Sequence, residues 1–262
     1  MKIIVCSKQI RQDNRIKPDR SGLEAALRLK KKTGAAVAFL CLGDASAITQ
    51  IREAMAMGCD EGTLLSYPEP QTLDGAACSS ILAAFLRNCS YDALISSSYA
   101  VDSDAIQTGL LLAGKLSLPS ASYVEDITPV FQEGQEHVQE DQAGSPEGAK
   151  PVSLVVRRKF EDCVYKLKLP LPCLVSALPR PNQPFYMTAQ GISRAYRAEI
   201  PVVSVSELLE RSGLPPAEQF IKIHIHDSHM KKPRERGRVL TVPTAEAVQA
   251  MMDLMIKNHI LS

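Results

Sequence analysis

Tryptophan is absent from this sequence, and aromatic residues make up only 5% of it. A planar ligand ring would therefore find few aromatic faces to stack on. No apolar run is long enough to cross a bilayer, and the net charge is only +1. We therefore expect neither membrane insertion nor binding to nucleic acid.

The sequence also lacks a CxxC pair, although it contains seven cysteines. Several of them lie in apolar strand or helix patterns, as small buried hydrophobic residues do in a reducing compartment. No signal peptide is recognised, because residues 1–5 enter a β-rich apolar run at once. We therefore expect a cytoplasmic protein without a disulfide framework.

With 262 residues, 45% of them hydrophobic, the chain can bury a large core. Short apolar runs alternate with segments of helical periodicity over its first half. The expected strands are residues 2–7, 35–42, 61–66 and 92–96. The expected helices are residues 23–33, 47–57, 72–88 and 106–118, and residues 8–22 are expected to form a loop. The alternation predicts an α/β fold with a doubly wound, mostly parallel sheet, of the Rossmann-like or adenine-nucleotide α-hydrolase-like kind.

The stretch YDALISSSYAVDSDAIQTGLLLAGKLSLP, residues 91–119, is the centre of this organisation. It is read as a buried strand, a polar loop with Asp102 and Asp104, and a helix that Pro119 stops. Such a junction places free backbone N–H groups just beyond the strand ends. In open α/β sheets an anionic ligand, often a nucleotide phosphate, is held there.

Beyond Pro119 the pattern changes. An acidic stretch at 132–150 is expected to be a surface loop. The remaining expected elements are extended residues 121–130, a hairpin within 152–169, a strand at 171–177, a Pro-rich and then basic loop at 178–198, a short helix at 204–211, an edge strand or arm at 221–226 and an amphipathic helix at 244–259. We therefore divide the chain into an α/β nucleotide-binding domain at 1–185 and a recognition loop with a C-terminal extension arm at 186–262.

No catalytic constellation emerges from the motifs. The DxD of Asp102 and Asp104 and the HxHxxH of His224, His226 and His229 could hold a metal, but loop carboxylates and a solvated arm are the simpler interpretations. Ser96-Ser97-Ser98 has no sequence-local base, and Gly43 opens a turn without G-x-G-x-x-G or a P-loop. A nucleotide pocket lined by backbone amides remains, which indicates a binding or carrier role.

The segments at 51–65 and 100–119 carry specific motifs, and together with four shorter segments they resemble the β subunit of electron-transfer flavoprotein. IREAMAMGCDEGTLL (51–65) is similar to the family's R-E-A-L-A-M-G-A-D segment, and AVDSDAIQTGLLLAGKLSLP (100–119) resembles A-I-D-x-D-x-x-Q-x-G-x-x-x-A-x-x-L-x-x-P. Further matches are KIIVCSKQI (2–10), LEAALRLK (23–30), PLPCLVSA (170–177) and NQPFY (182–186). They follow the family's order along nearly the whole chain.

The resemblance implies a heterodimer that shuttles electrons between a flavin dehydrogenase and an acceptor. The α subunit then shares the redox-active FAD and receives the terminal helix, and this subunit buries AMP or, alternatively, a second FAD. The implied nucleotide contacts are Cys6, Leu42, Gly43, Ser97, Ser98, Tyr99, Ala100, Val101, Asp102, Asp104, Ile106, Gln107 and Thr108. The implied partner-recognition residues are Met187, Ala189, Ile192, Arg194 and Arg197.

The chain departs from the family pattern at three places. The hairpin and N-P-F segment before the first helix are shortened to IKPDRSG at residues 16–22. Ser97 and Ile106 replace a Gly and an Asn of the nucleotide loop, and Ala189 stands where the partner-recognition loop has Leu. We therefore expect a divergent member with a dedicated dehydrogenase partner.

Two other functions fit an α/β nucleotide-binding domain. A stand-alone sensor of the universal-stress type would carry G-x-x-G-x-G-[ST], and a nucleotide-hydrolysing or transferring enzyme would carry S-G-G-x-D-S. Neither pattern occurs in the sequence, and the sensor leaves the chain beyond residue 120 unexplained.

Overall fold

A computed structural model describes residues 1–9, 11–12, 15–16, 20–97, 105–131, 150–160, 162–179, 185–223 and 241–260. The chain divides into two compact units, Met1–His224 and Ile225–Ser262, and each is described by itself. None of the helices in the described ranges is long and apolar enough to cross a membrane.

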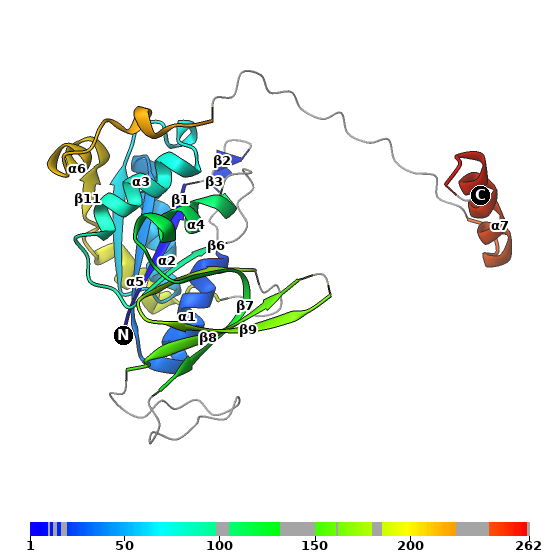
Figure 1. Ribbon diagram of the computed structural model, residues 1–262, viewed down its shortest axis with the longest axis horizontal. Helices are drawn as coiled ribbons and strands as arrows, with labels where there is room; N and C mark the ends of the chain where they lie inside the picture. Colours follow the sequence, from blue (N-terminus) through cyan, green and yellow to red (C-terminus); the bar gives the residue numbers. More distant parts are fainter. Residues whose placement is uncertain are drawn as a thin grey trace. The chain divides into compact units, whose positions relative to one another are not determined.

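The first unit is built on a nine-stranded sheet in the order β11-β5-β4-β1-β6-β10-β7-β8-β9 (Figure 1). Neighbouring strands run parallel from β11 to β7, and the last two strands are antiparallel additions. The strands are β1 (Lys2–Lys8), β4 (Ala36–Gly43), β5 (Glu61–Ser66), β6 (Ala93–Ser97), β7 (Ser120–Val130), β8 (Ser153–Lys159), β9 (Val164–Pro170), β10 (Cys173–Ala177) and β11 (Val202–Ser204).

Helices cover both faces of this sheet, which confirms the predicted α/β fold class. One face packs against α1 (Ser21–Thr33) and α2 (Ile48–Met57), with α5 (Ala189–Arg197) beside α2. The other face packs against α3 (Gly75–Leu86), α4 (Ala105–Lys115) and α6 (Val205–Arg211). Short 3-10 turns complete the unit at η1 (Ala45–Ala47), η2 (Pro70–Thr72) and η3 (Ala217–Phe220).

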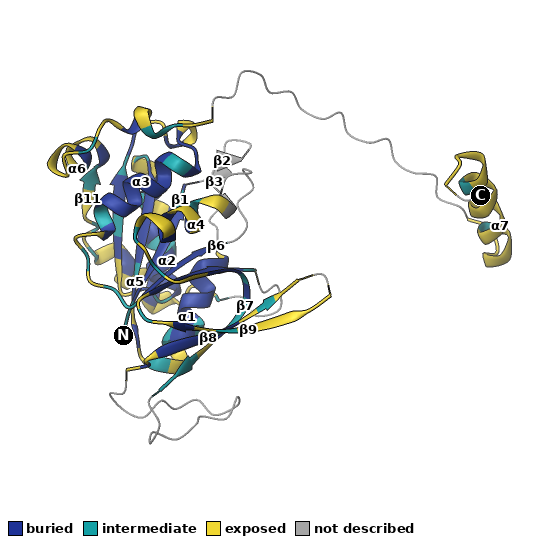
Figure 2. Ribbon diagram, in the orientation of Figure 1, coloured by how far each residue is buried: buried dark blue, intermediate teal, exposed yellow. Residues whose placement is uncertain are grey.

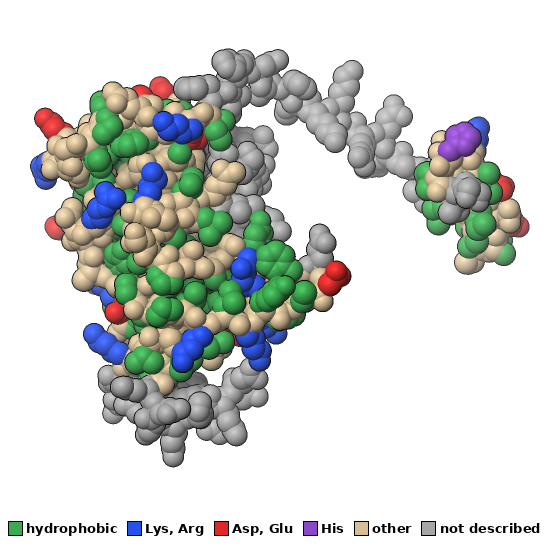
Figure 3. All heavy atoms as spheres, viewed as in Figure 1, with side chains coloured by type: hydrophobic (Ala, Val, Ile, Leu, Met, Phe, Trp, Pro, Cys, Tyr) green, Lys and Arg blue, Asp and Glu red, His purple; other side chains and the backbone are tan. Residues whose placement is uncertain are grey.

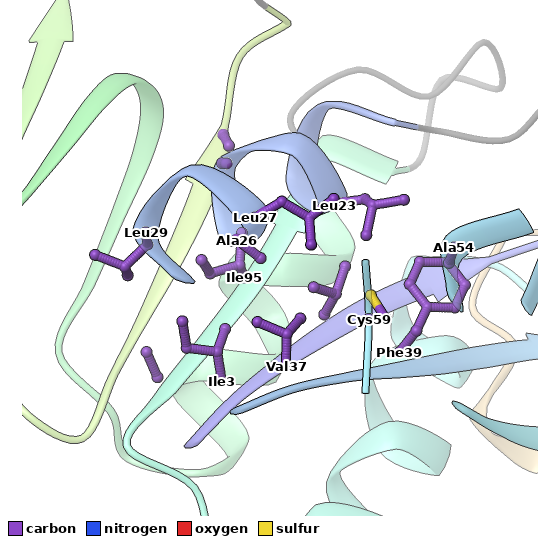
Figure 4. Packing of buried hydrophobic residues seen from close by; sticks show 14 of the residues in the cluster. Ile3, Leu23, Ala26, Leu27, Leu29, Val37, Phe39, Ala54, Cys59 and Ile95 are labelled. Carbon is purple, nitrogen blue, oxygen red and sulfur yellow. The ribbon is translucent and has the colours of Figure 1, made fainter. Parts of the chain in front are cut away.

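Strand alternation divides the buried side chains into two apolar layers, one on each face of the sheet. Figure 2 shows that buried residues concentrate in the central strands and in the helices beside them. On β1, Ile3 and Val5 join the layer beneath α1 and α2, while Ile4 and Cys6 join the layer beneath α3 and α4. Figure 4 shows how Ile3 and Phe39 pack with residues of α1 and α2. Burying one such side chain contributes about 1.5–3 kcal/mol, so the parallel strands form the stable centre of this unit.

The end of one predicted helix and both ends of one predicted strand are confirmed. Gly34 ends α1 with φ 64°, a left-handed conformation that glycine adopts at little cost. The strand expected at 61–66 is observed with the same bounds. The helix expected at 72–88 begins later, because Asp74 caps α3 by accepting a hydrogen bond from the Ala77 N–H at 2.8 Å.

Two sequence predictions were wrong, and one strand was missed. The loop expected at 8–22 contains two short antiparallel strands, β2 (Arg11–Gln12) and β3 (Arg15–Ile16). The loop expected at 178–198 contains α5, and the edge strand β11 was not anticipated. Both C-terminal elements depend on contacts with distant parts of the chain, since β11 pairs with β5 and α5 packs on α2.

Other predictions fall partly or wholly outside the described residues. These are most of the acidic loop at 132–150, the polar loop at 101–104 and the histidines at 224, 226 and 229. Residues 221–223, the described part of the predicted edge strand or arm, form no strand.

The second unit contains α7 (Thr244–Lys257), which confirms the predicted terminal helix. None of the residues of α7 is buried. Its exposed large apolar side chains are Val248, Met251, Met252, Leu254 and Ile256. Figure 3 shows hydrophobic side chains along this helix.

Candidate functional site

The strand order creates a topological switch point at β1. This strand lies between β4 and β6, which it pairs in parallel. The chain leaves β1 through α1 on one face, and it leaves β6 toward α4 on the other face. In open α/β sheets ligands bind outside the carboxyl ends of strands at such a point. The ends of β1, β4 and β6 are therefore the candidate site.

A buried amide ties the ends of β1 and β4 together. The Gln9 side chain is 2% exposed, and its Oε1 accepts a hydrogen bond from the Asp44 N–H at 2.7 Å. Its Nε2 donates to Ser46 Oγ at 2.8 Å and to Asp44 Oδ1 at 3.2 Å. A Cβ at Gly43 would lie 2.7 Å from Gln9 Oε1, so only glycine fits beneath the amide. Gln9 thus fixes two loops at the candidate site.

The end of β6 is held against α1. Ser97 Oγ accepts a hydrogen bond from the Gly22 N–H at 2.9 Å, which satisfies one of the unpaired donors at the start of α1. A Cβ at Gly22 would lie 3.0 Å from the Ser96 carbonyl carbon, so strand and helix approach closely. The Ser97 hydroxyl therefore supports the local fold.

The first turns of α4 lie over the same strand end. A Cβ at Gly109 would overlap Ser96 Oγ, so this helix also approaches β6 closely. Gln107 is exposed and Thr108 is half-buried. The first backbone N–H groups of a helix lack intrahelical acceptors and favour an anion. An anionic group beyond the end of β6 would therefore be stabilised by the backbone N–H groups at the start of α4.

Cys6, one of the predicted contacts, faces the apolar layer beneath α3 and α4. Burial, with a smaller contribution from Cys89, raises the pKa of its thiol to about 12. The thiol is therefore protonated at neutral pH and is a poor nucleophile. Register pairs Cys6 with Ser96 and Lys8 with Leu42, so the predicted strand-end residues do lie at one edge.

Leu42 is fully buried, so it would meet a ligand only through its backbone. Ser98, Tyr99, Ala100, Val101, Asp102 and Asp104, with the side chain of Ile106, lie outside the described residues. Sequence reasoning missed Gln9 and the supporting role of Ser97, because both depend on loops distant in sequence.

The predicted recognition residues gather on and beside α5. Met187, Ala189, Ile192 and Arg197 are exposed. Arg194 is exposed as well, but its Nη2 donates to the carbonyl oxygens of Met55 at 3.3 Å and Cys59 at 3.4 Å. This arginine therefore also attaches α5 to the carboxyl end of α2.

A second exposed apolar surface lies on the β8–β9 hairpin (Figure 3). Tyr123 and Phe160 pack edge to face with ring centroids 6.2 Å apart, and Phe160 and Tyr165 pack similarly at 5.9 Å. The Arg158 guanidinium lies 4.8 Å from the centre of the Phe160 ring.

No group of three or more His, Cys, Asp or Glu able to hold a metal occurs among the described residues.

The strand order and the helices on both faces define a doubly wound α/β domain, a class of fold in which ligands generally bind at the carboxyl edge of the sheet. Residues 9–208 match the family model described as electron transfer flavoprotein domain, and the chain belongs to this family.

Curated relatives align over most of their own length. One from Acetobacterium woodii, named caffeyl-CoA reductase-Etf complex subunit CarD, is 30% identical over 82% of this chain and 81% of its own. The acryloyl-CoA reductase electron transfer subunit gamma of Anaerotignum propionicum is 28% identical over 93% of this chain and 86% of its own. The electron transfer flavoprotein subunit beta of Homo sapiens is 28% identical over 91% of this chain and 90% of its own.

Proposed function

We propose that this chain is the β subunit of a heterodimeric electron-transfer flavoprotein, which carries electrons between a flavin dehydrogenase and an acceptor in the cytoplasm. The family match over residues 9–208 carries this proposal. Relatives named as subunits of CoA-ester reductase complexes support it. The chain itself acts as a carrier subunit, which agrees with the lack of a catalytic motif in its sequence.

The nucleotide belongs at the carboxyl edge of the sheet in this proposal. Three features support an adenine nucleotide there: the switch point at β1, the close approach of α4 to β6 and the rigid loops held by Gln9. AMP is the proposed occupant, and a second FAD is the alternative. The redox-active FAD is shared with the α subunit.

Residues 186–262 serve docking in this proposal, and residues 1–185 hold the nucleotide. The exposed apolar side chains of α7 support its docking on the α subunit, because a helix with no buried residue lacks the packing that stabilises most helices. Met187, Ala189, Ile192, Arg194 and Arg197 form the proposed contact with the dehydrogenase. Ala189 in place of the family's Leu favours a dedicated partner.

The test is co-expression with an α subunit, followed by acid release and counting of FAD and AMP per heterodimer. One FAD and one AMP per complex would support a simple carrier, and two FAD would indicate an electron-bifurcating member. A chain that forms no complex and releases no nucleotide would contradict the proposal. A monomer that responds to ATP would instead favour the sensor, and ATP turnover would favour the nucleotide-using enzyme.

A matched pair of variants tests the nucleotide position. Gln107 is exposed near the start of α4, and Lys115 is the last residue of the same helix. Gln107→Ala should lower nucleotide occupancy, and Lys115→Gln should retain it. Equal occupancy in both variants would place the nucleotide elsewhere.

A further inference from the structure

Two arginines attach α5 to α2, because one arginine of each helix donates hydrogen bonds to backbone carbonyls near the carboxyl end of the other helix. Arg52 of α2 donates through Nη1 to the carbonyl oxygens of Ala195 and, at 3.4 Å, Ala198 near the end of α5. Arg194 of α5 donates in return to the carbonyls of Met55 and Cys59 at the end of α2. Cations at helix carboxyl ends are favourable because they satisfy unpaired carbonyls and oppose the dipole.

Small residues bring the two helices into direct contact. A Cβ at Gly191 would overlap the Ala56 carbonyl oxygen, so α5 lies against the backbone of α2. Ala195, one turn later, is fully buried. The Thr188 side chain caps α5 by accepting a hydrogen bond from the Gly191 N–H at 3.0 Å. The orientation of α5 is therefore fixed before any partner binds.

This attachment leaves one defined face of α5 exposed. Ala189, Ile192 and Tyr196 are spaced by three and four residues and so share that face. Tyr196 is its largest side chain and is 70% exposed. The Arg52 guanidinium lies 5.4 Å from the centre of the Tyr196 ring. A cation near an aromatic ring at this distance is attracted to it, which restricts the rotamers of the ring.

A restrained, exposed tyrosine has the properties of a binding hot spot. It offers a large apolar surface with a polar end, and little conformational entropy remains to be lost on binding. Tyr and Arg are enriched among residues whose truncation weakens protein interfaces most. Arg197 adds positive charge at the exposed end of α5.

We propose that Tyr196 is the anchor residue through which the flavin dehydrogenase recognises this chain, and that Arg52 is the residue that positions it. The partner's site is an apolar pocket rimmed by carboxylates, because an apolar face bordered by Arg197 requires that complement. The inference rests on the proposed function. It adds to the recognition set a residue that the sequence did not suggest, and it gives Arg194 an internal role.

The test measures electron exchange between the intact heterodimer and a purified CoA-ester dehydrogenase, selected from a panel by its activity with the wild-type complex. Tyr196→Ala should raise the KM for the heterodimer about tenfold or more and leave kcat nearly unchanged. Tyr196→Phe should restore most of the affinity. Tyr165→Ala is the matched control, because Tyr165 is 49% exposed and lies on β9, outside the docking segment at residues 186–262. Its KM should stay within about twofold of the wild-type value.

A double-mutant cycle tests the positioning role. Arg52→Lys keeps the charge but loses the planar fork that reaches two carbonyls and the ring. It should raise the KM severalfold in the wild-type background and add little in the Tyr196→Ala background. Additive effects would reject the coupling between the two residues.

The proposed function and the anchoring role of Tyr196 can be refuted separately. A wild-type complex that exchanges electrons with no dehydrogenase of the panel would overturn the proposed function and this inference together. A wild-type complex that is active, with an unchanged KM in Tyr196→Ala or an equal loss in Tyr165→Ala, would overturn this inference alone.

Discussion

Helices α5 and α7 both present apolar side chains to solvent, but they do so in different ways. Helix α5 is fixed by Gly191, Arg194 and a capping threonine. Helix α7 has no buried residue. A fixed helix loses little entropy on binding, whereas a helix without packing depends on its partner for stability. We infer that α5 suits transient docking and that α7 suits permanent assembly.

The largest effect on this difference between the two helices is expected from a substitution that disrupts the contact of α5 with α2. Gly191→Ala places a Cβ against the Ala56 carbonyl oxygen, and the backbone can relieve the overlap only by moving the helix. We expect a loss of about 2–3 kcal/mol in unfolding free energy. Denaturant unfolding of the purified chain measures it.

Gly114→Ala is the control for this substitution. Gly114 also lies within a helix, α4, but a Cβ there would meet nothing within 4 Å. It should stabilise the chain by about 0.5–1 kcal/mol. If Gly191→Ala were as stable as Gly114→Ala, the close contact between α5 and α2 would be refuted.

Asp74 provides the second test, because it holds the last described residues before the second unit. Its carboxylate accepts backbone hydrogen bonds from Ala77 in α3, and from Lys222 at 2.6 Å and Ile223 at 2.9 Å. Burial alone would raise the pKa of Asp74, but these donors outweigh it and lower the pKa below its usual value. Asp74 therefore stabilises the first unit as an anion.

The lowered pKa fixes the direction of the pH dependence. The stabilisation is fully present above the unfolded pKa of about 4 and is lost as pH falls through the lower folded pKa. Asp74→Asn should cost about 1–2 kcal/mol at pH 7, and the difference from wild type should shrink below about pH 4. Unfolding free energies at both pH values check this. A constant difference would exclude ionic stabilisation by this residue.

The third test adds a charge to the apolar side of α7. Met251→Asp should weaken binding to the α subunit at least about tenfold, because a carboxylate would be buried in the interface. The stability of the chain alone should stay the same, since Met251 is exposed. Titration of the α subunit measures the affinity. Gln249→Asp, the control, adds the same charge at a neighbouring position, and equal weakening would reject Met251 as an interface residue.

The sequence predicted the sheet well because buried parallel strands require apolar runs that little else in the chain requires. The apolar runs of β1 and β4 illustrate this. Helix α5 was missed because it buries only Gly191 and Ala195, too few residues to produce an apolar period. Its stability comes from arginines whose partners lie about 140 residues away.

The candidate site was predictable only in part, for a similar reason. Strand ends can be located from the pattern, so the edge formed by β1, β4 and β6 was expected. Gln9 was not expected, because its buried amide bonds to Asp44 and Ser46 in a loop about 35 residues away. A polar residue directly after a buried strand, with a Gly-Asp turn after the next strand, is the signal that could have identified it.

The smallest effect concerns the cap of α5. Thr188→Ala removes the acceptor for the Gly191 N–H and should cost about 1 kcal/mol, whereas Thr188→Ser keeps the acceptor and should cost only a few tenths. The cap acts on the helix that is already fixed, so its loss should loosen the first turn, where Ala189 lies, without releasing Tyr196. Hydrogen exchange over residues 189–197 separates these outcomes. Faster exchange confined to the first turn is expected, and faster exchange along the whole helix would mean that the cap, and not the contacts with α2, holds α5 in place.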